Sequence, residues 1–174
     1  MRRLAAVLAA LWLAGCASLT PLAPAGDGDS FSGRLAVRVE AQVGVPARAL
    51  SAAFDLRGGA RAGALGLSTP LGSMLAQARW QPGEVVLATP QGTRRFDDLD
   101  GLTREVLGES VPIEAWFDWL HGRPWPGAPS SPTGAGFAQL GWTVDLGRFG
   151  ESAVSSRRTE PPPLVTVRIQ LDRP

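Results

Sequence analysis

The sequence predicts a mainly β domain in which one curved antiparallel sheet carries an inserted pair of helices. Apolar and polar residues alternate with a period of two through most of the chain after residue 30, as in strands with one buried face. Gly-Gly and Pro-Gly pairs interrupt these runs, as tight turns do. Between residues 98 and 122 the apolar spacing changes to that of helices.

The N-terminus has the form of a bacterial lipoprotein signal. A basic start precedes a short apolar run that ends in Leu13-Ala14-Gly15-Cys16. This pattern is typical of a secretory signal, and the run is too short to span a bilayer. The last four residues resemble a lipobox, which implies a signal peptide over residues 1–15 and covalent N-acyl and S-diacylglycerol groups on Cys16. The alternative is an ordinary signal peptide with a chance cysteine.

The signal also predicts the compartment. Two or three acyl chains anchor a protein stably where one chain does not. By resemblance to lipoproteins of Gram-negative bacteria, an Asp after the acylated cysteine would imply retention in the inner membrane, and here that residue is Ala17. We therefore expect a lipid anchor in the outer membrane, facing the periplasm. A tether over residues 16–30 and a domain over residues 31–174 follow.

The strands are predicted from the alternation. In the first of them, Phe31, Leu35 and Val37 share one face with polar residues between them. Further strands are expected at residues 50–57, 65–67, 74–80 and 85–87, with turns at Gly58-Gly59 and Pro82-Gly83, and near the C-terminus at residues 137–146 and 164–171.

Two helices are expected between the strands. Asp98 is a suitable N-cap for a helix that Gly108 ends. A second helix begins at Pro112 and ends at Gly122. Both carry an apolar stripe, which we expect to cover the concave face of the sheet as a plug or lid. Residues 123–136 are rich in Pro, Gly and Ser and are expected to form a loop.

Composition gives no support for nucleic-acid binding, metal binding or catalysis. All 17 basic residues are scattered arginines against 16 acidic residues, so no basic stripe exists for nucleic acid. His121 is the only histidine and lies at a helix end, where its charge is favourable. One histidine and one acylated cysteine do not make a metal site. Asp97, Asp98 and Asp100 could mimic a cation site, but helix capping and favourable charge in the first turn of a helix explain them more simply. We expect no catalytic residues, no metal and no other cofactor.

A loop between two strands carries an apolar residue at its tip. Pro70 cannot donate to a sheet ladder and Gly72 permits a turn, so Leu71 lies between two strands. Leu71 could fold back over the sheet as a rim residue, since single surface leucines are common. It could instead project as an exposed apolar side chain.

The aromatic composition is also unusual, because five tryptophans follow the signal and the chain has no tyrosine. Core packing is the simpler explanation. A cavity lined by Trp, Phe, Leu and Met would instead accept acyl chains. The candidates for such a cavity are Phe54, Leu56, Leu67, Trp80, Trp116 and Trp142.

Several segments in order resemble the outer-membrane lipoprotein family LolB. They are Phe31 to Val37, Ser68 to Ser73, Phe96 to Leu99, Leu102 to Gly108, Trp119 to Pro124 and Phe137 to Trp142, and with the lipobox they extend from residue 16 to about residue 172.

This resemblance implies a half-open antiparallel β-barrel with an α-helical plug, like the periplasmic carrier LolA. It implies a monomeric receptor that takes lipoproteins from LolA and inserts their acyl chains into the inner leaflet of the outer membrane. The Leu on the family's protruding loop corresponds to Leu71, within Pro70-Leu71-Gly72. Relatives often have a cavity Trp on the second strand where this chain has Leu56.

Two other functions are open. An acylated assembly or binding lipoprotein would use the aromatic groove to hold a protein strand. A periplasmic lipid hydrolase would use a serine that no Gly-x-Ser-x-Gly motif marks.

Overall fold

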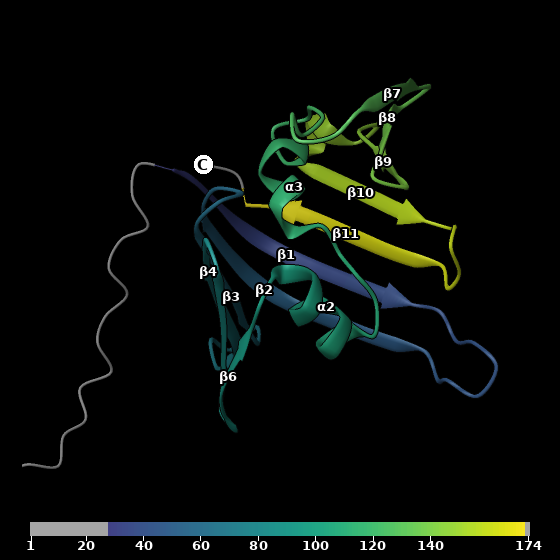
Figure 1. Cartoon of the computed structure of the whole chain (residues 1–174). Coiled ribbons are helices and arrows are strands. Elements are labelled where there is room, and N and C mark those ends of the chain that lie inside the picture. Colours follow the sequence, from purple (N-terminus) through teal and green to yellow (C-terminus); the bar gives the residue numbers. More distant parts are fainter. Residues whose placement is uncertain (1–27, 173–174) are drawn as a thin grey trace, which may run out of the picture.

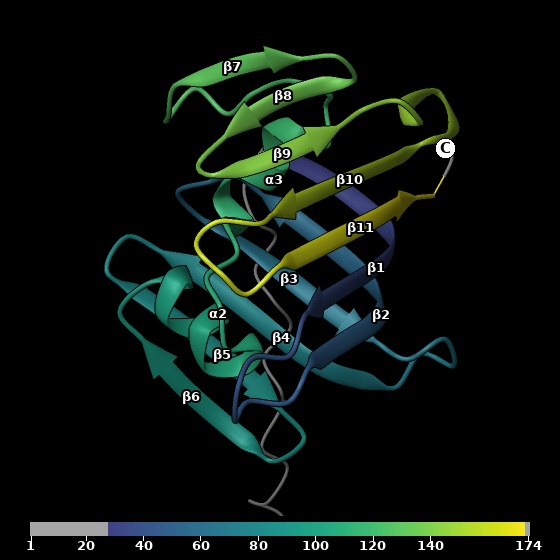
Figure 2. The same ribbon diagram turned by 90° about the vertical axis from the view of Figure 1, so that its right-hand side faces the viewer.

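The computed structural model describes residues 28–172 and consists of one eleven-stranded antiparallel sheet that curves around two short helices (Figure 1). The order across the sheet is β6-β5-β4-β3-β2-β1-β11-β10-β9-β8-β7. The first and last strands of the chain therefore pair in the middle of the sheet. They join an N-terminal arm, β1 to β6, to a C-terminal arm, β7 to β11, as in a half-open barrel (Figure 2).

The bounds of the strands follow the chain. The N-terminal arm contains β1 (Asp29–Val39), β2 (Arg48–Gly58), β3 (Gly63–Ser68), β4 (Met74–Gln81), β5 (Glu84–Thr89) and β6 (Gly92–Phe96). The C-terminal arm contains β7 (Ser130–Thr133), β8 (Gly136–Gln139), β9 (Trp142–Asp145), β10 (Ala153–Arg158) and β11 (Val165–Leu171), with a 3-10 turn over Phe149–Glu151 before β10.

Strict alternation explains the central strands. In β1, residues Leu35, Val37 and Val39 are buried, and the residues between them are exposed. They lie directly opposite Ile169, Val167 and Val165 of β11, so apolar side chains pair across the strands on the concave face. The predicted mainly β fold, with one apolar face and a helical insert, is confirmed.

The helical insert covers that concave face. Helix α2 (Leu99–Leu107) begins at Asp98, whose carboxylate accepts a 2.6 Å hydrogen bond from the Gly101 amide. It ends at Gly108, which has the positive φ of 83° that a left-handed C-cap needs. Helix α3 (Ile113–Trp119) is shorter than predicted, since Leu120 already closes its last turn and residues 121–122 lie beyond it. Both predicted helices are confirmed.

The structure corrects the sequence prediction at several strands. The expected strand over residues 137–146 is two strands, β8 and β9, because Leu140 and Gly141 turn the chain with positive φ values of 54° and 78°. The expected loop over residues 123–136 contains β7, an exposed edge strand without apolar residues. Strands β6 and β10 were not predicted. Strand β1 begins at Asp29, two residues before the expected start.

The predicted signal peptide, Cys16 and most of the predicted tether lie outside the described residues. Within residues 28–172, no helix is long and apolar enough to cross a membrane.

Candidate functional site

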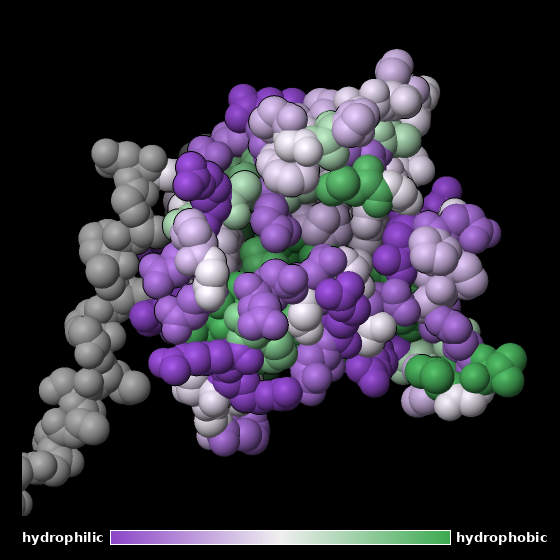
Figure 3. Space-filling model, in the orientation of Figure 1, coloured by the Kyte–Doolittle hydropathy of each residue, from purple (hydrophilic) through white to green (hydrophobic). Residues whose placement is uncertain are grey.

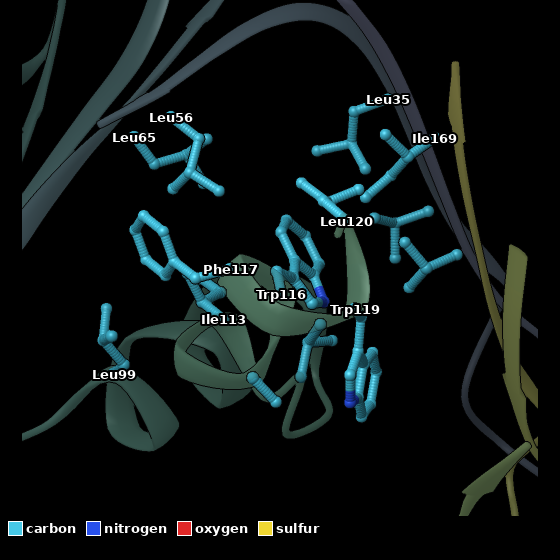
Figure 4. Packing of buried hydrophobic residues seen from close by; sticks show 14 of the residues in the cluster. Leu35, Leu56, Leu65, Leu99, Ile113, Trp116, Phe117, Trp119, Leu120 and Ile169 are labelled. Carbon is cyan, nitrogen blue, oxygen red and sulfur yellow. The ribbon is translucent and has the colours of Figure 1, made fainter. Parts of the chain in front are cut away.

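The space between the two arms of the sheet is filled by one apolar cluster built around α3. Five of its seven residues are buried: Ile113, Ala115, Trp116, Phe117 and Trp119. Figure 4 shows the Trp116 ring between Leu56 and Leu65 on one side and Leu35 and Ile169 on the other. A helix of seven residues is not stable alone, so this packing holds it in place.

The six cavity candidates all belong to this cluster or pack against it. Phe54 and Leu56 on β2, Trp80 on β4, Trp116 on α3 and Trp142 on β9 are each 5 % exposed or less, and Leu67 on β3 is half-buried. Such low exposure means that solvent hardly reaches these five side chains. An acyl chain could contact them only after a neighbouring element moves.

The candidates occupy both arms of the sheet. Phe54 and Leu67 are directly opposite each other on β2 and β3. The Trp80 ring lies edge-on to Phe117 of α3 at 6.2 Å, and its indole N–H donates to the Gly59 carbonyl. In the C-terminal arm, the Trp142 ring is 6.4 Å from the ring of Trp119. Helix α3 is therefore the element that both groups contact.

Two tryptophans of α3 differ in their polar contacts. The Trp119 indole N–H donates a 2.8 Å hydrogen bond to the side-chain oxygen of Gln139. The buried Trp116 indole N–H has no hydrogen-bond partner among residues 28–172. An unpaired buried donor destabilises the position it occupies by roughly 1–3 kcal/mol.

Gln139 joins α3 and the following loop to the sheet. Besides the bond from Trp119, its oxygen accepts from the Trp125 amide at 2.9 Å. Its nitrogen donates to the carbonyls of Trp125 and Ala128 at 2.7 and 2.8 Å. Sequence analysis did not single out this buried residue. The signal was its position two residues after Phe137, which places it on the inner face.

Two side-chain contacts fasten the insert to the sheet, one between its helices and one at its C-terminal end. Arg158 of β10 is buried, binds the Glu109 carboxylate at 2.5 Å and lies 5.8 Å above the Trp142 ring. His121, just after α3, lies 3.1 Å from the carboxylate of Asp29. Glu109 and Arg158 were missed because they are 49 residues apart and share no sequence motif.

The acidic residues at the start of the insert have structural partners. Asp98 caps α2, and the Asp100 carboxylate accepts a 2.5 Å hydrogen bond from Ser110. Among residues 28–172, no group of three or more His, Cys, Asp or Glu side chains could hold a metal ion. Burial raises the pKa of the Glu114 carboxyl, and the nearby charges of Asp100 and Asp98 raise this pKa further.

The loop between β3 and β4 presents Leu71 to solvent. The Gly72 amide donates to the Thr69 carbonyl, and the Ser73 amide donates to the Thr69 hydroxyl, so the turn is closed by its own hydrogen bonds. Leu71 is 95 % exposed at the tip. The alternative in which it folds back over the sheet is therefore wrong. A hollow of about 270 Å³ lies at the base of the loop, lined in part by Leu67 and Met74.

Comparison with known proteins identifies the family. A family model described as outer membrane lipoprotein LolB matches residues 30–172. The outer-membrane lipoprotein LolB of Bordetella petrii is 36% identical over 185 residues, which cover 98% of this chain and 92% of that protein. The LolB proteins of Bordetella pertussis and Cupriavidus pinatubonensis are each 34% identical, over 93% and 99% of this chain and 87% of each relative. The chain therefore belongs to the outer membrane lipoprotein LolB family.

Proposed function

We propose that this protein accepts lipoproteins from the periplasmic carrier LolA and inserts their acyl chains into the inner leaflet of the outer membrane. Membership of the LolB family places the protein among the outer-membrane lipoproteins that act in lipoprotein localization. The anchor is the acylated Cys16.

The single observation that carries the proposal is the exposed Leu71. A closed, hydrogen-bonded turn holds this large apolar side chain in water, where it contributes nothing to the core. Burying one leucine side chain is worth about 1.5–3 kcal/mol, enough to disturb a leaflet but not to anchor a protein in it. A short-lived membrane contact of this strength suits a protein that releases cargo and remains anchored elsewhere.

The concave face supplies the site for the acyl chains. It is lined by aromatic and aliphatic side chains from both arms, and α2 and α3 close it. Hydrophobic residues are visible between the two helices on the surface of the molecule (Figure 3). We place the entry of the acyl chains here, with the insert over residues 98–122 moving away from the sheet to admit them.

The forces that hold the insert are compatible with such a movement. Helix α2 contacts the sheet at β5 and β6, where Leu99 and Leu102 pack into the core and its polar link is an exposed ion pair of 2.9 Å between Glu105 and Arg94. Exposed ion pairs contribute little to stability. The unpaired N–H of Trp116 further lowers the stability of the closed position.

Transfer needs no nucleotide if each step is downhill. The acyl chains must prefer this cavity to that of the carrier, and the bilayer to this cavity. A site with apolar contacts and few polar ones favours such transient binding, because hydrophobic contacts are non-directional.

A cross-link between the insert and the sheet tests this function. Arg94→Cys with Glu105→Cys places two thiols where the ion pair now joins β6 to α2. Because Cys16 is the only natural cysteine, and is acylated in the proposed mature protein, a short bis-methanethiosulfonate reacts only at the new pair and forms two disulfides that can be reduced, with methanesulfinate as the leaving group. We expect cross-linking to abolish uptake of a fluorescent-acyl lipoprotein from LolA, and reduction to restore it.

The matched control joins two strands that already pair. Glu84→Cys with Arg95→Cys replaces a similar ion pair of 3.3 Å between β5 and β6. Cross-linking there should leave uptake unchanged. Undiminished uptake with the insert pinned would contradict movement of the insert. If the fluorescent-acyl lipoprotein is never taken up but a peptide strand binds, the result would support the acylated binding lipoprotein instead.

A further inference from the structure

The hairpin between β1 and β2 ends in a second exposed apolar tip. Val43 is fully exposed and Val45 is half-exposed. Two hydrogen bonds, of 2.9 and 3.0 Å, join Gln42 and Val45 across the turn, and Gly44 supplies a positive φ of 76°. The tip is therefore an ordered turn that holds Val43 outward. Turns at this position usually carry Gly, Asn, Asp or Ser.

The segment at this tip contains no charge. Residues 41–47 read Ala-Gln-Val-Gly-Val-Pro-Ala, with Glu40 and Arg48 at the base of the hairpin. In Figure 3 the tip is a green patch at the lower right, with hydrophilic residues around it. An apolar, uncharged tip above a polar base matches the change from acyl chains to head groups in a leaflet.

The strand order places this tip at the same end of the strands as the Leu71 loop, although the Leu71 loop begins at Ser68, opposite Ala53 in the middle of β2, whereas Val43 lies beyond the start of β2. Since all pairs are antiparallel, the turns after β1, β3, β5, β8 and β10 lie at one end. Seven large apolar side chains are exposed among residues 28–172, and five of them belong to or adjoin these turns: Val43, Val45, Leu71, Met74 and Leu140. Leu140 holds its exposed position with a positive φ of 54°, which is rare for a leucine.

We infer that the β1–β2 tip, through Val43 and Val45, enters the inner leaflet of the outer membrane as a second contact, separate from that of Leu71. This inference rests on the proposed function. A bilayer fits better than a protein partner because the tip is a narrow projection. A stable protein interface needs about 800 Å² on each side with matching shape, whereas a leaflet asks for no shape complementarity. Together with Cys16, two separate contacts would fix the orientation of the protein on the membrane.

Depth-dependent quenching tests the contact on the full acylated chain. Val43→Cys carries an environment-sensitive dye, and the protein is reconstituted in phosphatidylethanolamine–phosphatidylglycerol vesicles that contain lipids brominated on their acyl chains. Leu71→Cys is the comparison at the same end. Ala62→Cys, in the exposed turn after β2, is the control at the opposite end. We expect quenching at positions 43 and 71 to be several-fold stronger than at position 62.

The outcomes separate this inference from the proposed function. Quenching at position 71, with position 43 no different from position 62, would overturn the hairpin contact and leave the proposed function standing. Quenching at position 43 alone would support the hairpin contact and contradict the role given to Leu71.

A second measurement distinguishes a contact of the tip with the membrane from a contact with the carrier LolA. Val43→Glu with Val45→Glu should slow insertion of cargo into vesicles by about tenfold, from the loss of two apolar contacts and the burial of charge. Acceptance of cargo from LolA should be unchanged, and Val43→Leu with Val45→Leu should keep both steps. A loss of acceptance with normal insertion would assign the tip to the carrier and overturn the inference. Because the tip is exposed, the thermal midpoint should not move.

Discussion

Trp116 and Trp119 lie almost one turn apart on α3 and are equally buried, but only the Trp119 indole has a hydrogen-bond partner among the described residues. The sequence places both on an apolar helix and cannot tell them apart. What differs is the strand that each ring faces: Trp119 meets the amide of Gln139, and Trp116 meets aliphatic side chains. Whether a buried polar group finds a hydrogen-bond partner depends on such neighbours, which are distant in the sequence.

A matched pair of substitutions measures this difference. Trp116→Phe and Trp119→Phe remove the same atoms from the same helix. Both leave a small cavity, but only Trp119→Phe also removes a hydrogen bond. We expect Trp119→Phe to lower the free energy of unfolding by about 1–3 kcal/mol more than Trp116→Phe, as measured by urea denaturation. Equal losses would show that the Trp116 N–H has a partner in solution.

At the scale of elements, prediction from sequence succeeded where one face of a strand or helix is continuously apolar. Strands β1, β2 and β11 and both helices meet that condition. Strands β6 and β7 are the two edges of the sheet, so each has one neighbour and little burial. Strand β10 is internal, but two of its three inward positions are Ser156 and Arg158. Because its inner face is largely polar, the alternation of apolar and polar residues that predicts a strand is lost in β10.

The same limit applies to the site. The alternation of apolar and polar residues correctly placed the cavity candidates that lie on strands on the inner face of the sheet. The turn residues around Leu71 predicted a loop. The contacts that fasten the insert, from Gln139 and Arg158, join residues far apart in the sequence. Only the folded sheet brings them together.

The stability of α3 should depend on the charge of Glu114. Its pKa is raised in the folded state, first by burial and then by the charges of Asp100 and Asp98. A carboxyl with a raised folded-state pKa binds its proton more tightly when folded, so stability decreases as pH rises through the unfolded and then the folded pKa. Glu114→Gln should therefore raise the thermal midpoint at about pH 7 and have no effect at about pH 3.5, where the wild-type group is protonated in both states. An unchanged midpoint at neutral pH would contradict this.

At the scale of the whole molecule, the half-open barrel separates two tasks. The concave face and its helical insert form one packed apolar cluster, which under the proposed function opens to admit acyl chains. The turns at one end of the strands carry apolar side chains outward. Acceptance of acyl chains and their delivery to a bilayer can thus be altered separately, by changes in the insert or in the turns.

The most direct test of the central claim is delivery of lipoproteins in cells depleted of the native protein and supplied with a Leu71→Glu variant that is still acylated at Cys16. A charge at this exposed tip should leave folding unchanged, because Leu71 makes no contribution to the core. The account predicts that the variant accepts cargo from LolA but fails to insert it, so lipoproteins do not reach the outer membrane. Normal delivery by the variant would contradict the account and would leave an acylated binding lipoprotein as the better explanation.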